Sequence, residues 1–161
     1  MTVLYFDASA WVKRYYQEDG SRWVTQQFDD GSLIGASTLG LIEVAATFAR
    51  KRTAGALDAS RDRQIEIYLL DDWEGMFQVD LTAEAVAQSL NVARTFALRG
   101  ADCTHLASAV ILKERLALQA GEFALVTSDQ ELKTAALKFG LNVLDPIAEE
   151  IRAFAPPATE S

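Results

Sequence analysis

The sequence has very few of the residues that build disulfide frameworks and zinc sites. Of its 161 residues, one is cysteine (Cys103) and one is histidine (His105). A single cysteine excludes a disulfide within the chain and a zinc site made of several cysteines. We therefore expect a protein of a reducing compartment, the cytoplasm.

Long apolar segments are also missing. No apolar stretch approaches the roughly 18 residues that a membrane-spanning helix needs. The opening MTVLYFDASAW lacks a basic segment and reaches an acid at Asp7, which is not typical of a signal peptide. We expect a soluble chain with no membrane partner.

Positive charge is scarce, with 15 Lys and Arg against 23 Asp and Glu and a net charge of −8. Nucleic-acid-binding proteins usually present a basic face, so this balance lowers the expectation of such a function. It does not exclude a nuclease, because carboxylates that bind metal ions add to the negative total. The 50% of hydrophobic residues is typical of a globular domain.

Five short runs rich in β-branched and aromatic residues predict strands, at residues 2–6, 33–36, 77–81, 123–127 and 142–144. Helical patterns follow the first four, with starts expected near Ser9, Ser37 or Thr38, Thr82, and Ser128 or Asp129. Strands that alternate with helices predict a three-layer α/β/α fold with a mostly parallel sheet of four or five strands. We expect one domain over residues 1–150 and a frayed tail over residues 151–161.

Four short acidic segments are the most informative feature of the sequence. They are YFDASA around Asp7, LGLIEVA around Glu43, RGADCTHLASA around Asp102, and LVTSDQEL around Asp129. Each places a carboxylate beside an apolar run, where an unpaired anion is unfavourable. If the fold gathers these acids, their repulsion requires a cation, and Mg²⁺ or Mn²⁺ suits oxygen ligands best.

The predicted topology favours such a gathering. Asp7 and Asp129 follow predicted strands, and the carboxyl ends of parallel strands meet at the edge of the sheet where ligands bind. Glu43 and Asp102 lie near the starts of predicted helices. Metal ions held by carboxylates stabilise the charge that develops during phosphodiester hydrolysis. The pattern therefore indicates metal-dependent chemistry on phosphates.

Each acid also has an ordinary structural interpretation. Asp7, Asp102 and Asp129 fit helix N-caps, and Glu43 could lie on the polar side of its helix. We interpret His105 as a structural, partly buried side chain, because a metal-activated water needs no imidazole base. The aromatic residues at helical spacing are more typical of a core or a subunit contact than of a surface that stacks on RNA; they are Trp11, Tyr15, Tyr16 and Trp23.

Basic residues gather in a few places. Arg50, Lys51 and Arg52 end the helix that carries Glu43, where the helix dipole favours cations in any case. Arg99, just before Asp102, is the better candidate for contact with a substrate phosphate.

The acidic segments resemble those of the PIN-domain ribonucleases, and most closely the VapC-type toxins of type II toxin–antitoxin systems. The resemblance spans about Val3 to Pro146, through YFDASAWVKRY, STLGLIEVAATFARK, RGADCTHLASAV and LVTSDQELKTAALKFGLNVLDP. It implies a Mg²⁺-dependent endoribonuclease, with Mn²⁺ as the alternative ion. It also implies an RNA substrate, a cognate antitoxin and a homodimer.

The same resemblance assigns roles to individual residues. Asp7 and Asp102 would be the principal metal ligands, and Glu43 and Asp129 would complete the acidic pocket. The polar side chains that would orient these acids are Ser9, Thr38, and Thr127 or Ser128. Cys103 and Thr104 stand where many relatives carry small or apolar residues, a departure that leaves the acids in place.

Other classes of protein share parts of this pattern. A haloacid dehalogenase-like phosphatase also begins with an apolar strand and an aspartate, but its usual second acid two residues later is Ser9 here. A receiver domain would have adjacent acids early in the chain and a lysine after a late strand, and neither is correctly placed. A regulatory binding domain without catalytic activity is the remaining alternative.

Overall fold

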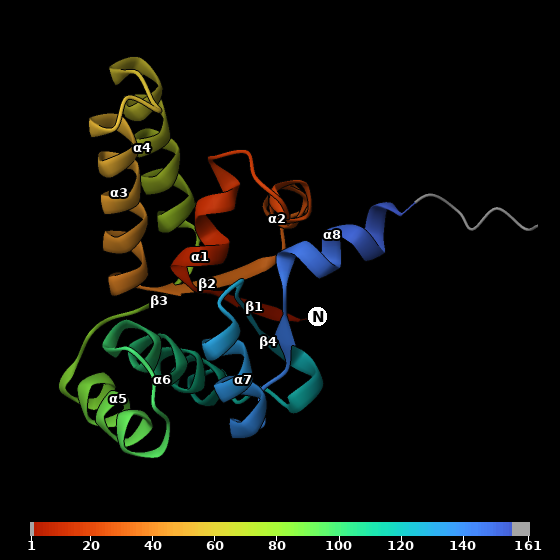
Figure 1. The fold of residues 1–161 in the computed structure, drawn as a ribbon. Coiled ribbons are helices and arrows are strands. Elements are labelled where there is room, and N and C mark those ends of the chain that lie inside the picture. The colour runs from red at the N-terminus through yellow and green to blue at the C-terminus, as the bar shows by residue number, and fades with distance from the viewer. Residues whose placement is uncertain (1, 156–161) are drawn as a thin grey trace, which may run out of the picture.

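The computed structural model of the protein describes residues 2–155, and within them it contains one parallel five-stranded sheet (Figure 1). The spatial order is β3-β2-β1-β4-β5, and every neighbouring pair is parallel. The strands are β1 (Val3–Phe6), β2 (Leu33–Ser37), β3 (Phe77–Val79), β4 (Phe123–Val126) and β5 (Val143–Leu144). All five predicted strands are present, and the predicted three-layer α/β/α fold is confirmed.

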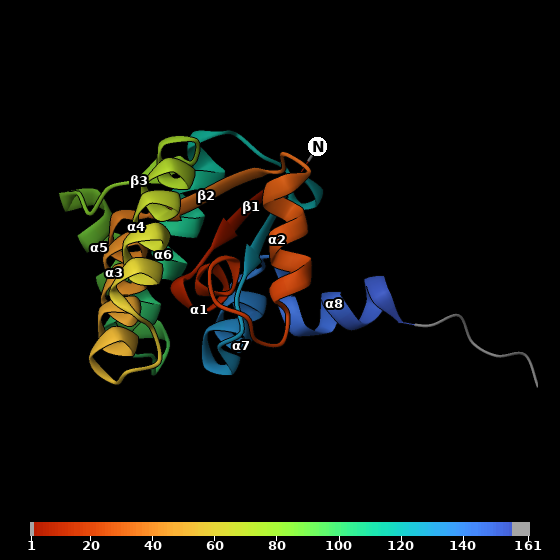
Figure 2. The same ribbon diagram turned by 90° about the horizontal axis from the view of Figure 1, so that it is seen from above.

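Helices cover both faces of the sheet (Figures 1 and 2). They are α1 (Ala8–Trp11), α2 (Ser21–Asp29), α3 (Thr38–Thr53), α4 (Ala59–Glu74), α5 (Ala83–Thr95), α6 (Gly100–Arg115), α7 (Gln130–Phe139) and α8 (Pro146–Phe154), with 3₁₀ turns at Val12–Arg14 and Ala120–Glu122. None of the helices in residues 2–155 combines the length and the apolar character that crossing a membrane would require.

The two faces of the sheet form two separate cores, because successive strand residues point to opposite sides. In β1, Val3 and Tyr5 pack with α5, α6 and α7, whereas Leu4 and Phe6 pack with α1, α2, α3 and α4. Three of the four aromatic residues expected in a core or contact are buried on the second side, namely Trp11, Tyr15 and Trp23.

The helices α3 and α4 form a hairpin that projects away from the sheet (Figure 1). Ser37 caps α3 through the amide of Gly40, and Asp58 caps α4 through the amide of Arg61. On α3, Val44 and Phe48 are buried against the core, whereas Ile42 is 60% exposed. Because α3 begins directly after β2, its start, and not the far end of the hairpin, lies at the carboxyl edge of the sheet.

The first helix and the end of the chain also depart from the prediction. Asp7, not Ser9, caps α1, which lasts one turn before it tightens into a 3₁₀ turn. At the other end, α8 continues to Phe154, beyond the expected boundary at residue 150. Residues 156–161, which form most of the expected tail, lie outside the described part of the chain.

Candidate active site

The strand order creates a natural binding position between β1 and β4. The chain moves outward to one side through β2 and β3 and to the other side through β4 and β5. Ligands of open parallel sheets bind at such a switch point, beyond the carboxyl ends of the strands. Asp7 follows β1 directly, and Thr127 follows β4 directly.

Asp7 is a buried carboxylate, only 3% exposed, at the end of β1. It accepts hydrogen bonds from the Ala10 amide at 2.9 Å, from the Ser9 hydroxyl at 2.8 Å and from the Thr127 hydroxyl at 2.6 Å. Burial raises the pKa of Asp7, and the charge of His105 together with these hydrogen bonds opposes that rise. In residues 2–155, the ion pairs of this edge involve the other three acids and not Asp7.

Two hydroxyl groups join the ends of β1 and β4. Thr127 donates to Asp7 and accepts from the Asp129 amide at 3.0 Å, while Ser9 accepts from the Ser128 amide at 3.0 Å. Asp7 and Asp129 therefore lie on one edge, as the sequence predicted. The Ser128 hydroxyl is buried and has no hydrogen-bond partner in the described residues, so it does not orient any of the acids.

Arg99 links Asp102 to Asp129. Its guanidinium donates to Asp102 at 3.0 Å and to Asp129 at 2.9 Å, although the Arg99 side chain is 71% exposed. The hydrogen bond to Asp102 and the two negative charges raise the pKa of Arg99. Asp102 itself is buried in the first turn of α6, while Asp129 caps α7 through the Leu132 amide. Arg99, expected at a substrate phosphate, is here the counter-ion of two acids.

Glu43 contacts His105, which lies on α6 three residues after Asp102. The Glu43 carboxylate lies 2.6 Å from His105 Nε2, and the Tyr5 hydroxyl lies 3.1 Å from His105 Nδ1. His105 is buried, which agrees with the structural role expected from the sequence, but its contact with Glu43 was not foreseen. The sequence does indicate that His105 lies near the acidic site, because it follows Asp102 by three residues and residues three apart lie on the same face of a helix.

Thr38 does not share this environment. Its hydroxyl donates to Asp80 at 3.0 Å, at the end of β3, and contacts none of the four acids. In this structure Thr38 therefore bonds to Asp80 and not to one of the four candidate acids. Its neighbour Ser37 caps α3 instead and lies beside Gly40, where an added Cβ would be 3.2 Å from His105 Cε1.

The donor atoms of this edge suit a hard divalent cation. Within residues 2–155, the ion pairs of the four carboxylates involve only Arg99 and His105, and none of these pairs includes the buried Asp7. In the described residues, however, no three His, Cys, Asp or Glu side chains are close enough to hold an ion together. The site thus fits an ion bound directly by one or two carboxylates with waters completing its shell, as Mg²⁺ prefers.

The fold and the carboxylates at the carboxyl edge of the sheet define an α/β protein with an acidic site at the switch point of a parallel sheet. Comparison with known proteins identifies its family. The PIN domain family matches residues 4–138, so the chain belongs to the PIN-domain family. Within that family it is similar to "Ribonuclease VapC49" of Mycobacterium tuberculosis (strain ATCC 25618 / H37Rv), with 36% identity over 152 residues. That alignment covers 91% of this chain and 100% of the relative.

Solved structures share the fold at low sequence identity. VapBC2 from Rickettsia felis, bound to a DNA fragment from its promoter, superposes with a TM-score of 0.60 at 12% identity, covering 89% of this chain and 98% of that one. A toxin–antitoxin complex from Klebsiella pneumoniae superposes with a TM-score of 0.57 at 12% identity, covering 89% and 97%. These likenesses concern the fold alone.

Proposed function

We propose that this protein is a metal-dependent endoribonuclease and the toxin of a toxin–antitoxin pair. One observation carries the proposal: a hydrogen-bonded network at the switch point joins Asp7 to Asp129 through Thr127, and Asp129 to Asp102 through Arg99. Phosphodiester cleavage needs a site that concentrates cations beside the phosphate. The network contains the three carboxylates of Asp7, Asp102 and Asp129 and one guanidinium, so its excess negative charge favours the binding of a cation.

We assign the metal-binding roles from the family resemblance and the supporting roles from the hydrogen bonds of the site. Asp7 and Asp102 would hold Mg²⁺, or alternatively Mn²⁺, and Glu43 and Asp129 would complete the acidic pocket. When bound, the ion would supply charge stabilisation and a water of lowered pKa. Ser9 and Thr127 fix the rotamer of Asp7. His105 holds Glu43, and Tyr5 in turn holds the imidazole.

The substrate and partners are inferred from the relatives. The sequence relative is named a ribonuclease and is aligned over its whole length, which supports RNA as the substrate. Two structural neighbours are VapBC2 and a toxin–antitoxin complex, which supports a cognate antitoxin as partner. A homodimer in the cytoplasm completes the proposal.

Replacing Asp7 or Asp102 with asparagine tests the proposed chemistry. We expect each variant to lose more than about 100-fold in Mg²⁺-dependent RNA cleavage, since loss of residues that merely support a ligand already reduces activity about 10–100-fold. A chelator should abolish wild-type cleavage, and added Mg²⁺ or Mn²⁺ should restore it. Cleavage of a labelled RNA on a gel measures all three effects.

Asp80→Asn is the matched control, because Asp80 also follows a strand, but within residues 2–155 its carboxylate bonds only to Thr38. It should cleave RNA like the wild type, and circular dichroism should show that all variants are folded. Full Mg²⁺-dependent cleavage by the Asp7 and Asp102 variants would contradict the proposed site. A protein that binds the metal and cleaves no RNA would favour the regulatory binding domain.

A phosphatase that uses Asp7 as its nucleophile is less well supported. The position of its expected second acid is Ser9, whose hydroxyl donates to both oxygens of Asp7 at 2.8 and 2.9 Å. Asp7 therefore has a hydroxyl where such a phosphatase has an acid that protonates the leaving group.

A further inference from the structure

The outer half of the α3–α4 hairpin, residues 47–63, is positively charged although the whole protein is acidic. It contains five Lys and Arg and two Asp, a net charge of +3 in a chain whose net charge is −8. The five cations are Arg50, Lys51, Arg52, Arg61 and Arg63. A local basic surface is what an acidic protein needs in order to bind a polyanion.

These cations differ in how far they are already engaged. Arg52 pairs with Asp62 at 2.5 Å, Lys51 lies 3.8 Å above the ring of Tyr16, and Arg61 donates to the Tyr15 carbonyl. Among the described residues, the Arg50 side chain donates only to the hydroxyl of Thr47, one turn earlier in the same helix. Within residues 2–155, neither Arg50 nor Arg63 forms an ion pair.

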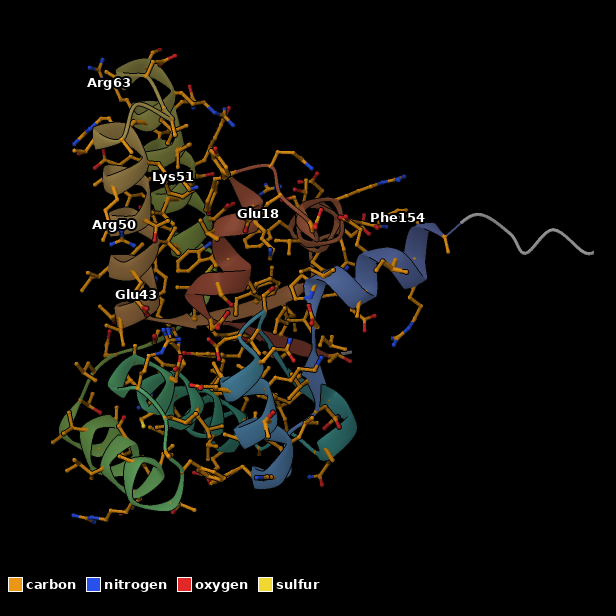
Figure 3. The ribbon with its side chains drawn as sticks, in the orientation of Figure 1. Glu18, Glu43, Arg50, Lys51, Arg63 and Phe154 are labelled. Atoms are coloured by element: carbon orange, nitrogen blue, oxygen red, sulfur yellow. The ribbon has the colours of Figure 1, made fainter. Side chains whose placement is uncertain are left out.

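Arg50 is also aligned with the candidate active site. It follows Glu43 by seven residues, which is close to two full turns, so both side chains project from the same face of α3. Figure 3 shows Glu43 at the sheet end of α3, Arg50 and Lys51 farther along, and Arg63 at the far end of the hairpin. Seven residues correspond to about 10 Å along the helix axis.

That separation matches a short stretch of RNA. In a DNA duplex, the phosphates of one strand recur about every 3.4 Å along the axis. If a stacked RNA strand has a similar spacing, about 10 Å spans roughly three nucleotides, and fewer in an extended strand. A strand whose scissile phosphate lies beside the acids could therefore present another phosphate to Arg50. The guanidinium would then exchange its hydrogen bond to Thr47 for a charge-assisted bond to phosphate.

We propose that Arg50 binds a phosphate of the RNA substrate a few nucleotides from the cleaved bond, with Arg63 extending the same path. The exposed face of α3 thus acts as a substrate-binding surface that begins at Glu43. This inference rests on the proposed ribonuclease function and adds the route of the strand across the protein.

A purely structural interpretation of Arg50 makes a different prediction. Arg50, Lys51 and Arg52 all lie in the last turn of α3, where the helix dipole stabilises any cation. In that interpretation, Arg50→Gln and Arg52→Gln would have similar small effects on stability and no effect on RNA. Arg52 is thus a matched control, since it shares the dipole but is already paired with Asp62.

The test measures KM and kcat for a single-stranded RNA of about twelve nucleotides over a range of salt concentrations. For Arg50→Gln, we expect KM to rise about 3- to 10-fold at low salt with kcat nearly unchanged, because a phosphate contact remote from the chemistry is lost. The slope of log KM against log salt should fall by about 0.7, the value for one contact to a single strand. Arg50→Lys should retain most of the affinity, and Arg52→Gln should stay within about twofold of wild type.

Each remaining outcome overturns the inference. Equal effects of Arg50→Gln and Arg52→Gln, or an unchanged salt slope, would show that Arg50 does not contact RNA. Normal RNA kinetics together with weakened binding of an antitoxin would assign Arg50 to the protein partner. If the wild type cleaves no RNA, the proposed function fails and this inference fails with it. If the wild type cleaves RNA and Arg50→Gln has the same KM, kcat and salt dependence, only this inference fails.

Discussion

At the scale of single residues, Thr127 has the most constrained position in the acidic site. It is fully buried, its hydroxyl donates to Asp7 at 2.6 Å, and the same oxygen accepts from the Asp129 amide at 3.0 Å. One small side chain thus fixes the orientation of one acid and the backbone of another. A group that orients metal-binding carboxylates usually matters almost as much as the carboxylates themselves.

Thr127→Val keeps the shape of the side chain and removes the hydroxyl. We expect RNA cleavage to fall about 10- to 100-fold and the Mg²⁺ concentration for half-maximal activity to rise, because Asp7 loses a hydrogen bond that holds its carboxylate. Thr127→Ser should recover most of both, since it restores the hydroxyl. A Mg²⁺ titration of cleavage rates measures the two effects, and a valine variant with unaltered Mg²⁺ dependence would refute this role for Thr127.

The sequence predicts the acids of the site better than their partners. Asp7 and Asp129 could be assigned to one edge because each follows an apolar run, and parallel strands end together. The pairing of Glu43 with His105 depends on how closely α3 approaches α6, which a local sequence pattern does not specify. Gly40 permits that approach, since a Cβ there would lie 3.2 Å from His105 Cε1.

At the scale of elements, α8 is a helix that the sequence analysis did not predict, and it runs into the expected tail. Its start has ordinary features, with Asp145 as N-cap and Pro146 in the first turn. Its stability depends on a tertiary contact, because Glu150 accepts from the amides of Gly20, Arg22 and Trp23 at 3.2, 2.7 and 3.1 Å. A carboxylate thus satisfies the free amides at the start of α2 from a helix that is distant in sequence.

Glu150→Gln tests this attachment of α8. The amide side chain keeps one acceptor oxygen but turns a donor toward an N–H group, so we expect the free energy of unfolding to fall by about 0.5–2 kcal/mol, as when an N-cap is lost. Glu149→Gln is the control, because in the described part of the chain the Glu149 carboxylate bonds only to Arg152 of the same helix, and such a pair contributes about 0.2–0.5 kcal/mol. Urea unfolding followed by tryptophan fluorescence compares the two, and equal losses would argue against the Glu150 contact.

At the scale of the whole molecule, the sequence predicts the layers but not the order of the strands. Alternating strands and helices require a covered parallel sheet, yet many strand orders satisfy that pattern. The observed order places β1 and β4 side by side in the middle, and this adjacency brings Asp7 to Thr127. The acidic site is therefore a product of topology as much as of the four acidic segments.

The helix α6 packs closely on the sheet at Gly35, in the middle of β2. A Cβ on Gly35 would lie 2.3 Å from Leu112 Cδ2 of α6 and 3.1 Å from the Phe77 carbonyl oxygen of β3. Leu112 is buried, so its side chain has little room to move, and the carbonyl belongs to a neighbouring strand. Glycine at this position lets α6 rest directly on the sheet, which also sets the height of Asp102 and His105 above it.

Gly35→Ala should therefore destabilise the protein although alanine is the better strand residue. Overpacking costs about 1–3 kcal/mol, and the gain in backbone entropy offsets about 0.5–1 kcal/mol of it. Gly121→Ala, with no atom within 4 Å of its added Cβ, should change the free energy of unfolding by less than about 0.5 kcal/mol. Adding Leu112→Ala to Gly35→Ala should destabilise less than the sum of the single changes, because the cavity left by Leu112 accommodates the new methyl group. Strict additivity in urea unfolding would show that the sheet and α6 are not in tight contact at this point.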